Sequence, residues 1–500
     1  MSAPQELLAY IVSARGKGFS DEAITQALRN AGWSKRDIQK AFEPHEPQTK
    51  PSRQAISPLV IFISIMLFLL FGGACAYGLY VYQNQLKITP SPTPTPNPIP
   101  TTYPPAGGHS SASPSAHPSA TSSSQLSSDI SFAHNGFGFD VFKDLLKTEG
   151  DKNVVISPTS IALALSMTYN GASESTKLAM AKTLKISAID TKKLNEESAT
   201  LIKLLSNPDP QVTLSIANSI WARKGIAFLP EFLNTNKTYY NAQIQSLDFT
   251  LPSAADTINA WVSTNTKGKI PTIVAKPIAP TIVMYLINAI YFYGTWTYEF
   301  DTALTQVLPF TLPDTSKIQH LMMKQERKDF LYQETNAFQG VLLPYGKNKQ
   351  LSMVIMLPKT TFSAFLGQLT HATWNSWMKS FAEMQGTLLL PKFKIEYKTS
   401  LSKTLSALGM ANAFSESADF SGMRKQKDLF ISDVIHKTYI DVNEQGTEAA
   451  AVTSVSVGIT SIGEPKKTFL MEVNKPFFFA ITDTQSGEIL FMGGINNPSK

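Results

Sequence analysis

The sequence has a single cysteine, Cys75, in 500 residues, so no disulfide can form within the chain. Charged residues are also few, at 16% of the total, and the net charge is only +6. This charge is not concentrated: residues 129–500 contain 35 Lys and Arg against 32 Asp and Glu, a net of +3. Because binding to phosphates requires a concentrated basic face, we expect no nucleic-acid partner.

Motifs of the common enzyme classes are missing as well. The chain has no Gly-x-Ser-x-Gly elbow, no His-Glu-x-x-His pair and no Walker loop. It has seven histidines, and two of them, His109 and His117, lie in a stretch rich in Pro, Ser and Thr. We therefore predict that the protein is not an enzyme and has no catalytic residue, no cofactor and no metal site.

The N-terminal part has apolar residues at helical spacing. Ser20 and Ser34 follow the turn residues Gly18 and Gly32 and stand where helix N-caps are expected. We predict a small three-helix bundle over residues 1–46, which resembles the ubiquitin-associated type in outline. Two roles remain open for it, a scaffold or a module that binds a cytoplasmic partner.

A long uncharged segment follows this bundle. No Asp, Glu, Lys or Arg occurs between Arg53 and Lys87, and residues 56–82 are almost wholly apolar. About 20 apolar residues suffice to cross a bilayer, so we predict a transmembrane helix at 56–82. Several basic residues precede it and only Lys87 follows closely, which predicts a cytoplasmic N-terminus and an extracellular C-terminal part.

Residues 87–128 are rich in Pro, Ser and Thr. Dense prolines favour extended polyproline II structure, so this segment is interpreted as a stalk that holds residues 129–500 away from the membrane. A single anchor and an outer part without disulfides fit a bacterial surface protein.

The most informative part of the chain is the stretch 441–476. It lies between two predicted strands, residues 430–442 and 476–481, and is long for a connection, which favours a functional loop. After Gly446 it consists of small and β-branched residues, with no proline until after Gly463. We interpret it as a loop that can enter a sheet. With strand alternation, one face of it carries only small uncharged residues: Thr447, Ala449, Ala451 and Thr453.

This stretch resembles the hinge and reactive-centre loop of the serpins, protease inhibitors that trap their target by inserting the loop into their main sheet. Further serpin-like motifs, such as Ser157-Pro158-Thr159-Ser160 and Leu390-Pro-Lys-Phe393, follow one another in the order of that family. They lie within residues 153–164, 259–270, 286–296, 390–393, 419–422, 436–437 and 490–493. The resemblance implies an α+β fold over residues 129–500, with about three sheets surrounded by helices.

The resemblance also implies roles for particular residues. The hinge that begins insertion comprises Glu444, Gly446, Thr447, Glu448, Ala449, Ala450 and Ala451. The shutter, polar side chains beneath the sheet that hydrogen-bond between two strands that must part, comprises Ser157, Ser160, Asn288 and His436. The breach, where the loop enters, contains Trp296 and Lys392, with Lys392 paired to Glu444. A histidine in apolar surroundings, such as His436, is interpreted as a hydrogen-bonded core residue rather than a catalyst.

The spacing from Glu444 that is usual in the family places the cleaved bond at Thr460-Ser461, with Ile459 and Ile462 as alternatives. The surrounding small and β-branched residues suit a serine protease with a shallow apolar pocket, although a cysteine protease stays open as a target. Because the hinge lacks bulky residues and proline, we predict an inhibitor. The alternative is a non-inhibitory member of the family that acts as a binding or surface-display protein.

Overall fold

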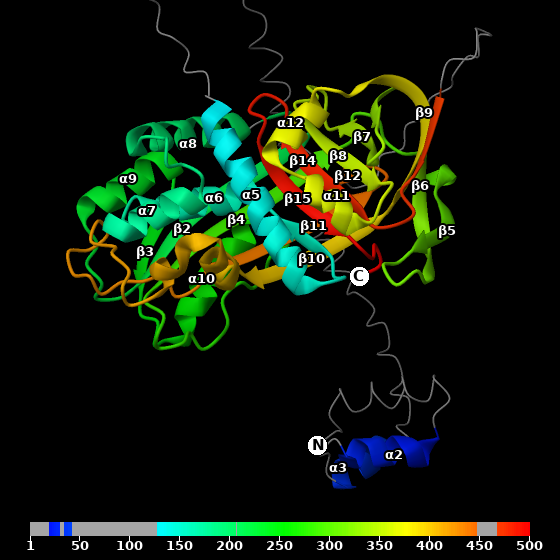
Figure 1. Ribbon diagram of the computed structural model, residues 1–500. Helices are drawn as coiled ribbons and strands as arrows, with labels where there is room; N and C mark the ends of the chain where they lie inside the picture. Colours follow the sequence, from blue (N-terminus) through cyan, green and yellow to red (C-terminus); the bar gives the residue numbers. More distant parts are fainter. Residues whose placement is uncertain (1–19, 31–34, 43–127, 207, 448–467) are drawn as a thin grey trace, which may run out of the picture. The chain divides into compact units, whose positions relative to one another are not determined.

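The computed structural model of the protein describes residues 20–30, 35–42, 128–206, 208–447 and 468–500. The chain divides into two compact units, residues 1–115 and 116–500 (Figure 1). The predicted transmembrane helix at 56–82 and nearly all of the predicted stalk lie outside the described residues. Within the described ranges, no helix is long and apolar enough to cross a membrane.

The first unit contains two described helices, α2 (Asp21–Asn30) and α3 (Lys35–Phe42). They begin directly after Ser20 and Ser34, as the sequence predicts. Each helix buries one face, through Ile24 and Leu28 in α2 and through Ile38 in α3. The first helix of the predicted bundle falls in residues that the structure does not describe.

Helices and strands alternate along the second unit, and helices lie on both sides of it in Figure 1. They are α5 (Ser128–Glu149), α6 (Pro158–Tyr169), α7 (Glu174–Thr183), α8 (Thr191–Leu205), α9 (Pro230–Tyr240), α10 (Pro252–Asn265), α11 (Phe362–Gln368), α12 (His371–Met378) and α13 (Ser402–Leu405). Short helical turns follow at Thr302–Leu304, Ser406–Met410 and Ala411–Phe414. Helix α6 is buried along its whole length, which its run of small and apolar residues permits.

The strands of the second unit are β1 (Val154–Ile156), β2 (Val212–Arg223), β3 (Gln243–Leu247), β4 (Met284–Thr295), β5 (Gln306–Thr311), β6 (Lys317–Glu334), β7 (Phe338–Pro344), β8 (Leu351–Pro358), β9 (Ala382–Pro391), β10 (Phe393–Ser400), β11 (Ile435–Asn443), β12 (Gly446–Thr447), β13 (Thr468–Glu472), β14 (Phe477–Asp483) and β15 (Ile489–Ile495). Among the described residues they form two sheets. One has nine strands, in the order β1-β15-β14-β8-β7-β6-β9-β13 with β5 paired to β6, and the other has six, in the order β10-β11-β12-β4-β2-β3.

The α+β class is confirmed, but the hydrogen-bond pattern gives two sheets where about three were expected. The reason is the length of β6, which runs for 18 residues. Its first part pairs with β5 and its last part pairs with β7, while β9 follows it on the other edge. One strand thus joins two sheet regions that shorter strands would have left separate.

The six-stranded sheet lies between two helices. Alternate residues of β4, among them Leu286, Ile290 and Phe292, belong to the core that includes α6. The intervening residues Tyr285, Ile287 and Ala289 instead pack into a second apolar cluster with α10. Because successive side chains of a strand point to opposite faces, β4 is covered on both sides and reads as a nearly continuous apolar run.

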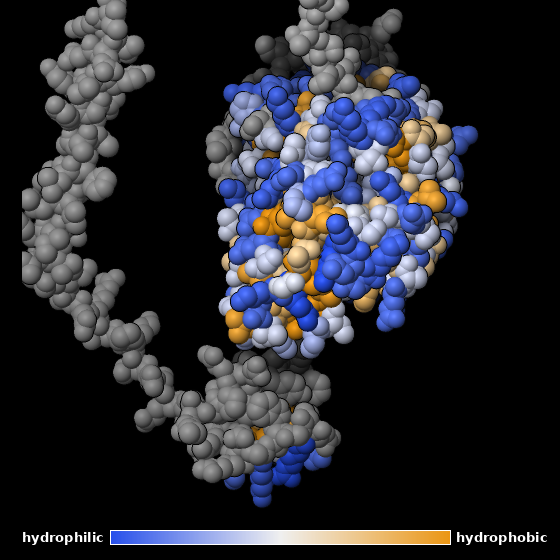
Figure 2. All heavy atoms as spheres, turned by 90° about the vertical axis from the view of Figure 1, so that its left-hand side faces the viewer, coloured by the Kyte–Doolittle hydropathy of each residue, from blue (hydrophilic) through white to orange (hydrophobic). Residues whose placement is uncertain are grey.

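The surface of the second unit is mixed in character. Figure 2 shows one face of it, on which hydrophilic residues predominate and hydrophobic residues gather in the middle and lower parts. Leu178 and Leu251 are among the exposed large apolar residues of the unit. Most large apolar side chains, by contrast, lie in one extended core.

One predicted strand begins later than expected. The sequence predicts a strand from residue 430, whereas β11 begins at Ile435. Its neighbour β10 ends at Ser400, the partner of Ile435, so no ladder is available before that point. Asp433 instead accepts hydrogen bonds from the Ser400 and Ser402 hydroxyls and from the Val434 amide, and this segment has no regular secondary structure.

Candidate functional site

The start of the long loop lies between strands β4 and β11. After β11 the chain turns at Glu444 and Gln445 and then continues as β12, which pairs with β11 on one side and β4 on the other. The register pairs Gly446 with Asn443 and Thr295, and Thr447 with Val442 and Gly294. Two residues of the predicted hinge therefore already occupy a position inside the sheet.

Gly446 adopts a backbone conformation that other residues rarely take, with φ of 153°. A Cβ atom at this position would clash with the backbone oxygen of Gly294 on β4. The turn into the sheet consequently needs glycine for two reasons, conformation and space. This agrees with the sequence interpretation of Gly446 as the bend of the hinge.

Aromatic residues hold Thr447 in its position between β4 and β11. Its side chain is buried, and its hydroxyl lies 2.7 Å from the Tyr345 hydroxyl. The Tyr345 ring stacks on Trp296 with a centroid distance of 4.4 Å. Trp296 in turn donates from its indole N–H to the Asn443 carbonyl and from its amide to the Gln445 carbonyl, at 2.9 and 2.8 Å. Trp296, predicted for the breach from its motif, thus supports both ends of the hinge turn.

Glu444 is bound through both carboxylate oxygens. One accepts from Lys392 Nζ and the other from the Thr305 hydroxyl, each at 2.8 Å. The side chain of Glu444 is only 7% exposed and that of Lys392 is 34% exposed. Because the Glu444 carboxylate is shielded from solvent, its charged hydrogen bonds are worth more than those of an exposed ion pair.

The pKa of Glu444 reflects two opposing effects. Burial favours the neutral acid and raises the pKa, whereas the hydrogen bonds from Lys392, the backbone and Thr305 favour the carboxylate. Together the hydrogen bonds outweigh burial and hold the pKa of Glu444 below its usual value. The hinge turn is therefore anchored by a charged group at neutral pH.

The four predicted shutter residues come together at the first turn of α6. The Ser160 hydroxyl donates to the Asn288 side-chain oxygen on β4. The Ser157 amide donates to His436 Nε2 on β11 at 3.1 Å, and the Ser157 hydroxyl caps the helix by accepting from the Ser160 amide. These bonds tie each strand to α6. Among the described residues no hydrogen bond joins Asn288 and His436 directly, so bonds between the two strands through these residues stay a prediction.

Comparisons with known proteins agree with this geometry. The family model described as serpin (serine protease inhibitor) matches residues 132–498. The chain belongs to the serpin family. Serpin B11 of Homo sapiens is 35% identical over 393 residues, which cover 74% of this chain and 99% of the relative. The leukocyte elastase inhibitor of Bos taurus is 35% identical over 381 residues, with the same coverage.

A solved structure of a relative has the same fold. The native state of tengpin, a thermophilic serpin, superposes with a TM-score of 0.67 at 35% identity and covers 73% of this chain and 93% of its own. The serpin fold is therefore shown for the second unit. The matched region excludes the first unit, whose resemblance to ubiquitin-associated bundles these comparisons do not address.

His436, which is predicted to belong to the shutter, is buried. Burial lowers its pKa to about 3, so the ring is neutral at physiological pH. Because Nε2 accepts the Ser157 amide proton, the neutral ring carries its own proton on Nδ1. Protonation of Nε2 would remove the acceptor, so His436 acts as a hydrogen-bonded core residue, as the sequence suggested.

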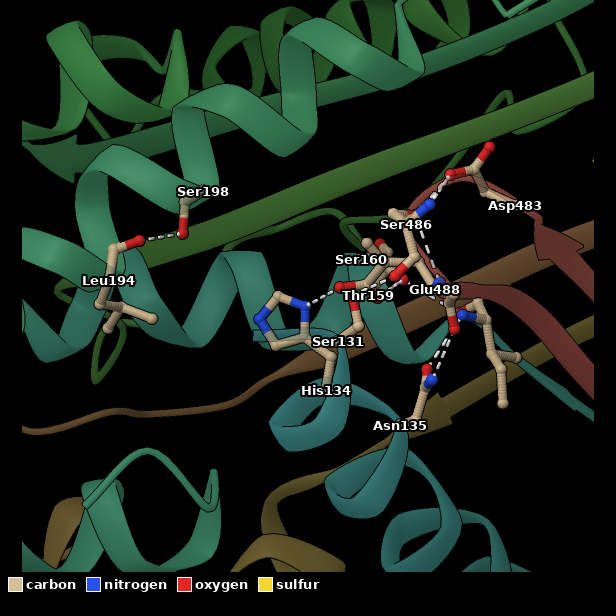
Figure 3. Close-up of polar contacts among 12 residues, drawn as sticks. Ser131, His134, Asn135, Thr159, Ser160, Leu194, Ser198, Asp483, Ser486 and Glu488 are labelled. Carbon is tan, nitrogen blue, oxygen red and sulfur yellow. Dashed lines mark hydrogen bonds and ion pairs between the residues drawn. The ribbon is translucent and has the colours of Figure 1, made fainter. Parts of the chain in front are cut away.

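A second buried polar cluster lies beside the shutter, on the same turn of α6 (Figure 3). The Thr159 hydroxyl donates to one oxygen of Glu488 at 2.7 Å, and the other oxygen lies 2.9 Å from His134 Nδ1. Glu488 is in the turn before β15, and His134 is on α5; both are almost fully buried. Asn135 also binds this turn through the Gly487 carbonyl and the Ile489 amide.

The sequence did not indicate several residues of the site. Tyr345 and Thr305 reach the hinge from segments about 100 or more residues away. Asn218 belongs to no recognised motif, although its side-chain oxygen accepts a hydrogen bond from the Asn288 side chain at 2.5 Å. No local pattern marks such long-range partners. Within the described ranges, no group of three or more His, Cys, Asp and Glu residues could hold a metal ion.

The remaining predicted site residues lie outside the described residues. They are the hinge residues Glu448, Ala449, Ala450 and Ala451, and the residues around the proposed cleaved bond, Ile459, Thr460, Ser461 and Ile462.

Proposed function

We propose that this serpin is a suicide-substrate inhibitor of serine proteases. The protease serine attacks the carbonyl carbon of Thr460, the peptide bond to Ser461 breaks, and an ester joins protease and inhibitor. The freed chain before Thr460 then enters the sheet between β4 and β11 and carries the protease with it before water hydrolyses the ester. In serpins, loop insertion adds a strand to the sheet and releases strain that is stored in the uncleaved chain.

The position of β12 is the observation that carries this proposal. Gly446 and Thr447 already pair with both β11 and β4, so they define a register for the residues that would follow. Continued in that register, residue 449 lies opposite Phe292 and Ile440, which are 3% and 1% exposed. Residue 453 lies opposite Asn288 and His436, in the shutter. The inward face then takes Thr447, Ala449, Ala451 and Thr453, all small and uncharged.

Insertion can supply enough free energy to distort a protease. A strand of about a dozen residues that pairs on both sides gains roughly twenty hydrogen bonds, each worth about 1 kcal/mol net. The sum, on the order of 20 kcal/mol, exceeds the stability of a typical domain, about 5–15 kcal/mol. The uncleaved chain is accordingly proposed to be metastable.

The proposed target is a serine protease with a small or apolar specificity pocket. The residues around Thr460 are small or β-branched, with Ile459 and Ile462 as alternative specificity residues. Two relatives in Bos taurus and Sus scrofa carry the name leukocyte elastase inhibitor, which supports a pocket of this kind. Trypsin-like pockets require a cation, and Lys466 and Lys467 lie several residues too late for that role.

The inhibitor is further proposed to be displayed on a bacterial cell surface. The uncharged residues 56–82 would form a single transmembrane helix with the N-terminus in the cytoplasm, and residues 87–128 would form a stalk. At about 3 Å per residue where prolines dominate, this stalk would hold the serpin domain tens of ångströms from the bilayer. Residues 1–46 would then be available to a cytoplasmic partner.

Incubation of residues 128–500 with an elastase-type protease tests the inhibitory function. This segment is suitable because it matches relatives such as Serpin B11 over 99% of their own length. We expect a covalent complex of protease and inhibitor that survives SDS. Cleaved inhibitor that is released without trapping the protease should have a much higher Tm than the uncleaved inhibitor. Clean cleavage without a complex and without a rise in Tm would instead identify a non-inhibitory, surface-display serpin.

Protease shaving of intact cells that produce the full chain tests the location. The serpin domain should be released or nicked, whereas residues 1–46 should be protected until the cells are lysed. Protection of both parts in intact cells would contradict the proposed orientation.

A further inference from the structure

A groove with a volume of about 700 Å³ lies on the serpin domain, away from the hinge and the shutter. It is formed by the end of α5, the turn between β5 and β6, the start of α11 and the residues that lead into β14. Figure 1 shows α5 and α11 on the same side of the unit. This volume is typical of sites that enclose a small molecule.

The walls of the groove are apolar. Leu146, Leu312, Phe362 and Leu366 line it, and each is a partly buried residue whose inner side packs against the main core. Their outer sides face the groove instead of protein. Such side chains offer an apolar ligand a surface from which water is easily displaced.

Three lysines also line the groove: Lys143 and Lys147 from α5, and Lys475 from the segment before β14. Lys143 and Lys475 are half-buried, and none of the three forms an ion pair with another described residue. Burial and the neighbouring Lys147 lower the pKa of Lys143, although the charge of Asp140 acts in the opposite direction. The single acidic residue of the lining is Asp151.

The α5 macrodipole explains only part of this arrangement. Cations near the C-terminus of a helix are favourable, which accounts for Lys147 in the last turn of α5. It does not account for Lys475, which comes from a different part of the chain and lines the same groove. Convergence of lysines from two elements on one apolar cavity is the pattern expected of an anion site.

We infer that this groove binds a small amphipathic anion, with an acyl or aromatic body against the leucine and phenylalanine walls and one carboxylate, sulfonate or phosphate group among the lysines. Three lysines and one aspartate leave a local charge of about +2, which a single anionic head complements. A groove of this volume favours a small molecule over the flat surface of a macromolecule.

The probe for this site is 1-anilinonaphthalene-8-sulfonate, compared with N-phenyl-1-naphthylamine, which has the same ring system without the sulfonate. Both are titrated into residues 128–500, and binding is measured by fluorescence. We expect saturable binding of the sulfonate probe at one site. Raising the salt from about 0.05 to about 0.5 M should weaken the sulfonate probe but not the neutral one.

Variants assign the binding to this groove. Lys143→Gln and Lys475→Gln should each weaken the sulfonate probe by about tenfold and leave the neutral probe unchanged, because a charged hydrogen bond is lost. Leu366→Ala should weaken both probes. Lys182→Gln, which removes one exposed lysine in the last turn of α7, is the matched control and should change neither.

Two outcomes would overturn the inference. The first is a sulfonate affinity in Lys143→Gln and Lys475→Gln that equals that of the parent protein. The second is an equal loss of both probes in variants whose circular dichroism spectrum equals that of the parent protein, which would show that these lysines do not contact the anionic group.

Discussion

A pair of neighbouring substitutions in the hinge tests the register of insertion. Ala449→Glu and Ala450→Glu add the same charge to adjacent residues. If insertion continues the register of β12, residue 449 would face the buried side chains of Phe292 and Ile440. Residue 450 would then face Tyr291 and Tyr439, which are half-buried, on the other side of the sheet. The two variants should therefore behave differently although their composition is the same.

The magnitude follows from the two environments. A carboxylate carried into the core at residue 449 has no partner, and its burial costs several kcal/mol. Even about 3 kcal/mol in the barrier slows insertion about a hundredfold. At residue 450 the carboxylate would lie near Lys269 and Lys394, whose ammonium groups are 5.0 and 5.6 Å from the Tyr439 ring centroid. There it should cost little.

The assay is the partition between trapping and release. Each variant is incubated with an elastase-type protease, and the number of inhibitor molecules cleaved per protease trapped is measured from SDS-stable complexes. Ala449→Glu should be cleaved with almost no complex, whereas Ala450→Glu should trap within about twofold of the parent. Equal trapping by both variants, or equal loss in both, would refute the register.

Other predictions concern the side chains that bind the hinge turn and the strands beside it. His436 has a pKa of about 3 in the folded protein and about 6.5 in the unfolded chain. Its contribution to the free energy of unfolding is therefore fully present above pH 6.5 and is lost as the pH falls toward 3. The free energy of unfolding should then fall by up to about 1.4 kcal/mol per pH unit in that window, and His436→Gln should flatten this slope in denaturant titrations. Glu444→Gln should lower the stability of the uncleaved form by about 1.5–3 kcal/mol at pH 7, whereas at a pH below the lowered pKa of Glu444 the difference should vanish. Tyr345→Phe should cost about 1 kcal/mol through loss of the contact with Thr447, and Thr447→Val should not add to that cost in a double-mutant cycle.

The sequence indicated the parts of this site that depend on local chemistry. The need for glycine at Gly446 and for small residues after it follows from strand geometry, and the motif around Ser157 marks the start of α6, where the serine caps the helix. The resemblance to serpins then brought Asn288 and His436 to the same place. What no motif predicted was that Ser157 and Ser160 at the start of α6 would donate the hydrogen bonds to the two strands.

Long-range partners could not be predicted for a physical reason. Thr305 and Tyr345 have no special sequence environment, and each acquires its role only because distant strands end beside the hinge turn. The same holds for the start of β11, which depends on where its neighbour β10 ends rather than on the β propensity of residues 430–434. Tertiary context decides such details, whereas propensity decides only which segments are candidates.

The first turn of α6 explains how the sheet can be both closed and ready to open. Ser157, Thr159 and Ser160 are nearly consecutive, yet they bind three different elements: β11 through His436, the turn before β15 through Glu488, and β4 through Asn288. The bond through Glu488 fixes this turn to the nine-stranded sheet and α5, so α6 forms a rigid base. In the proposed mechanism β4 and β11 separate, and each is attached to that base: β11 through His436 and β4 through Asn288. A strand that entered between them could therefore leave these polar groups bonded to α6.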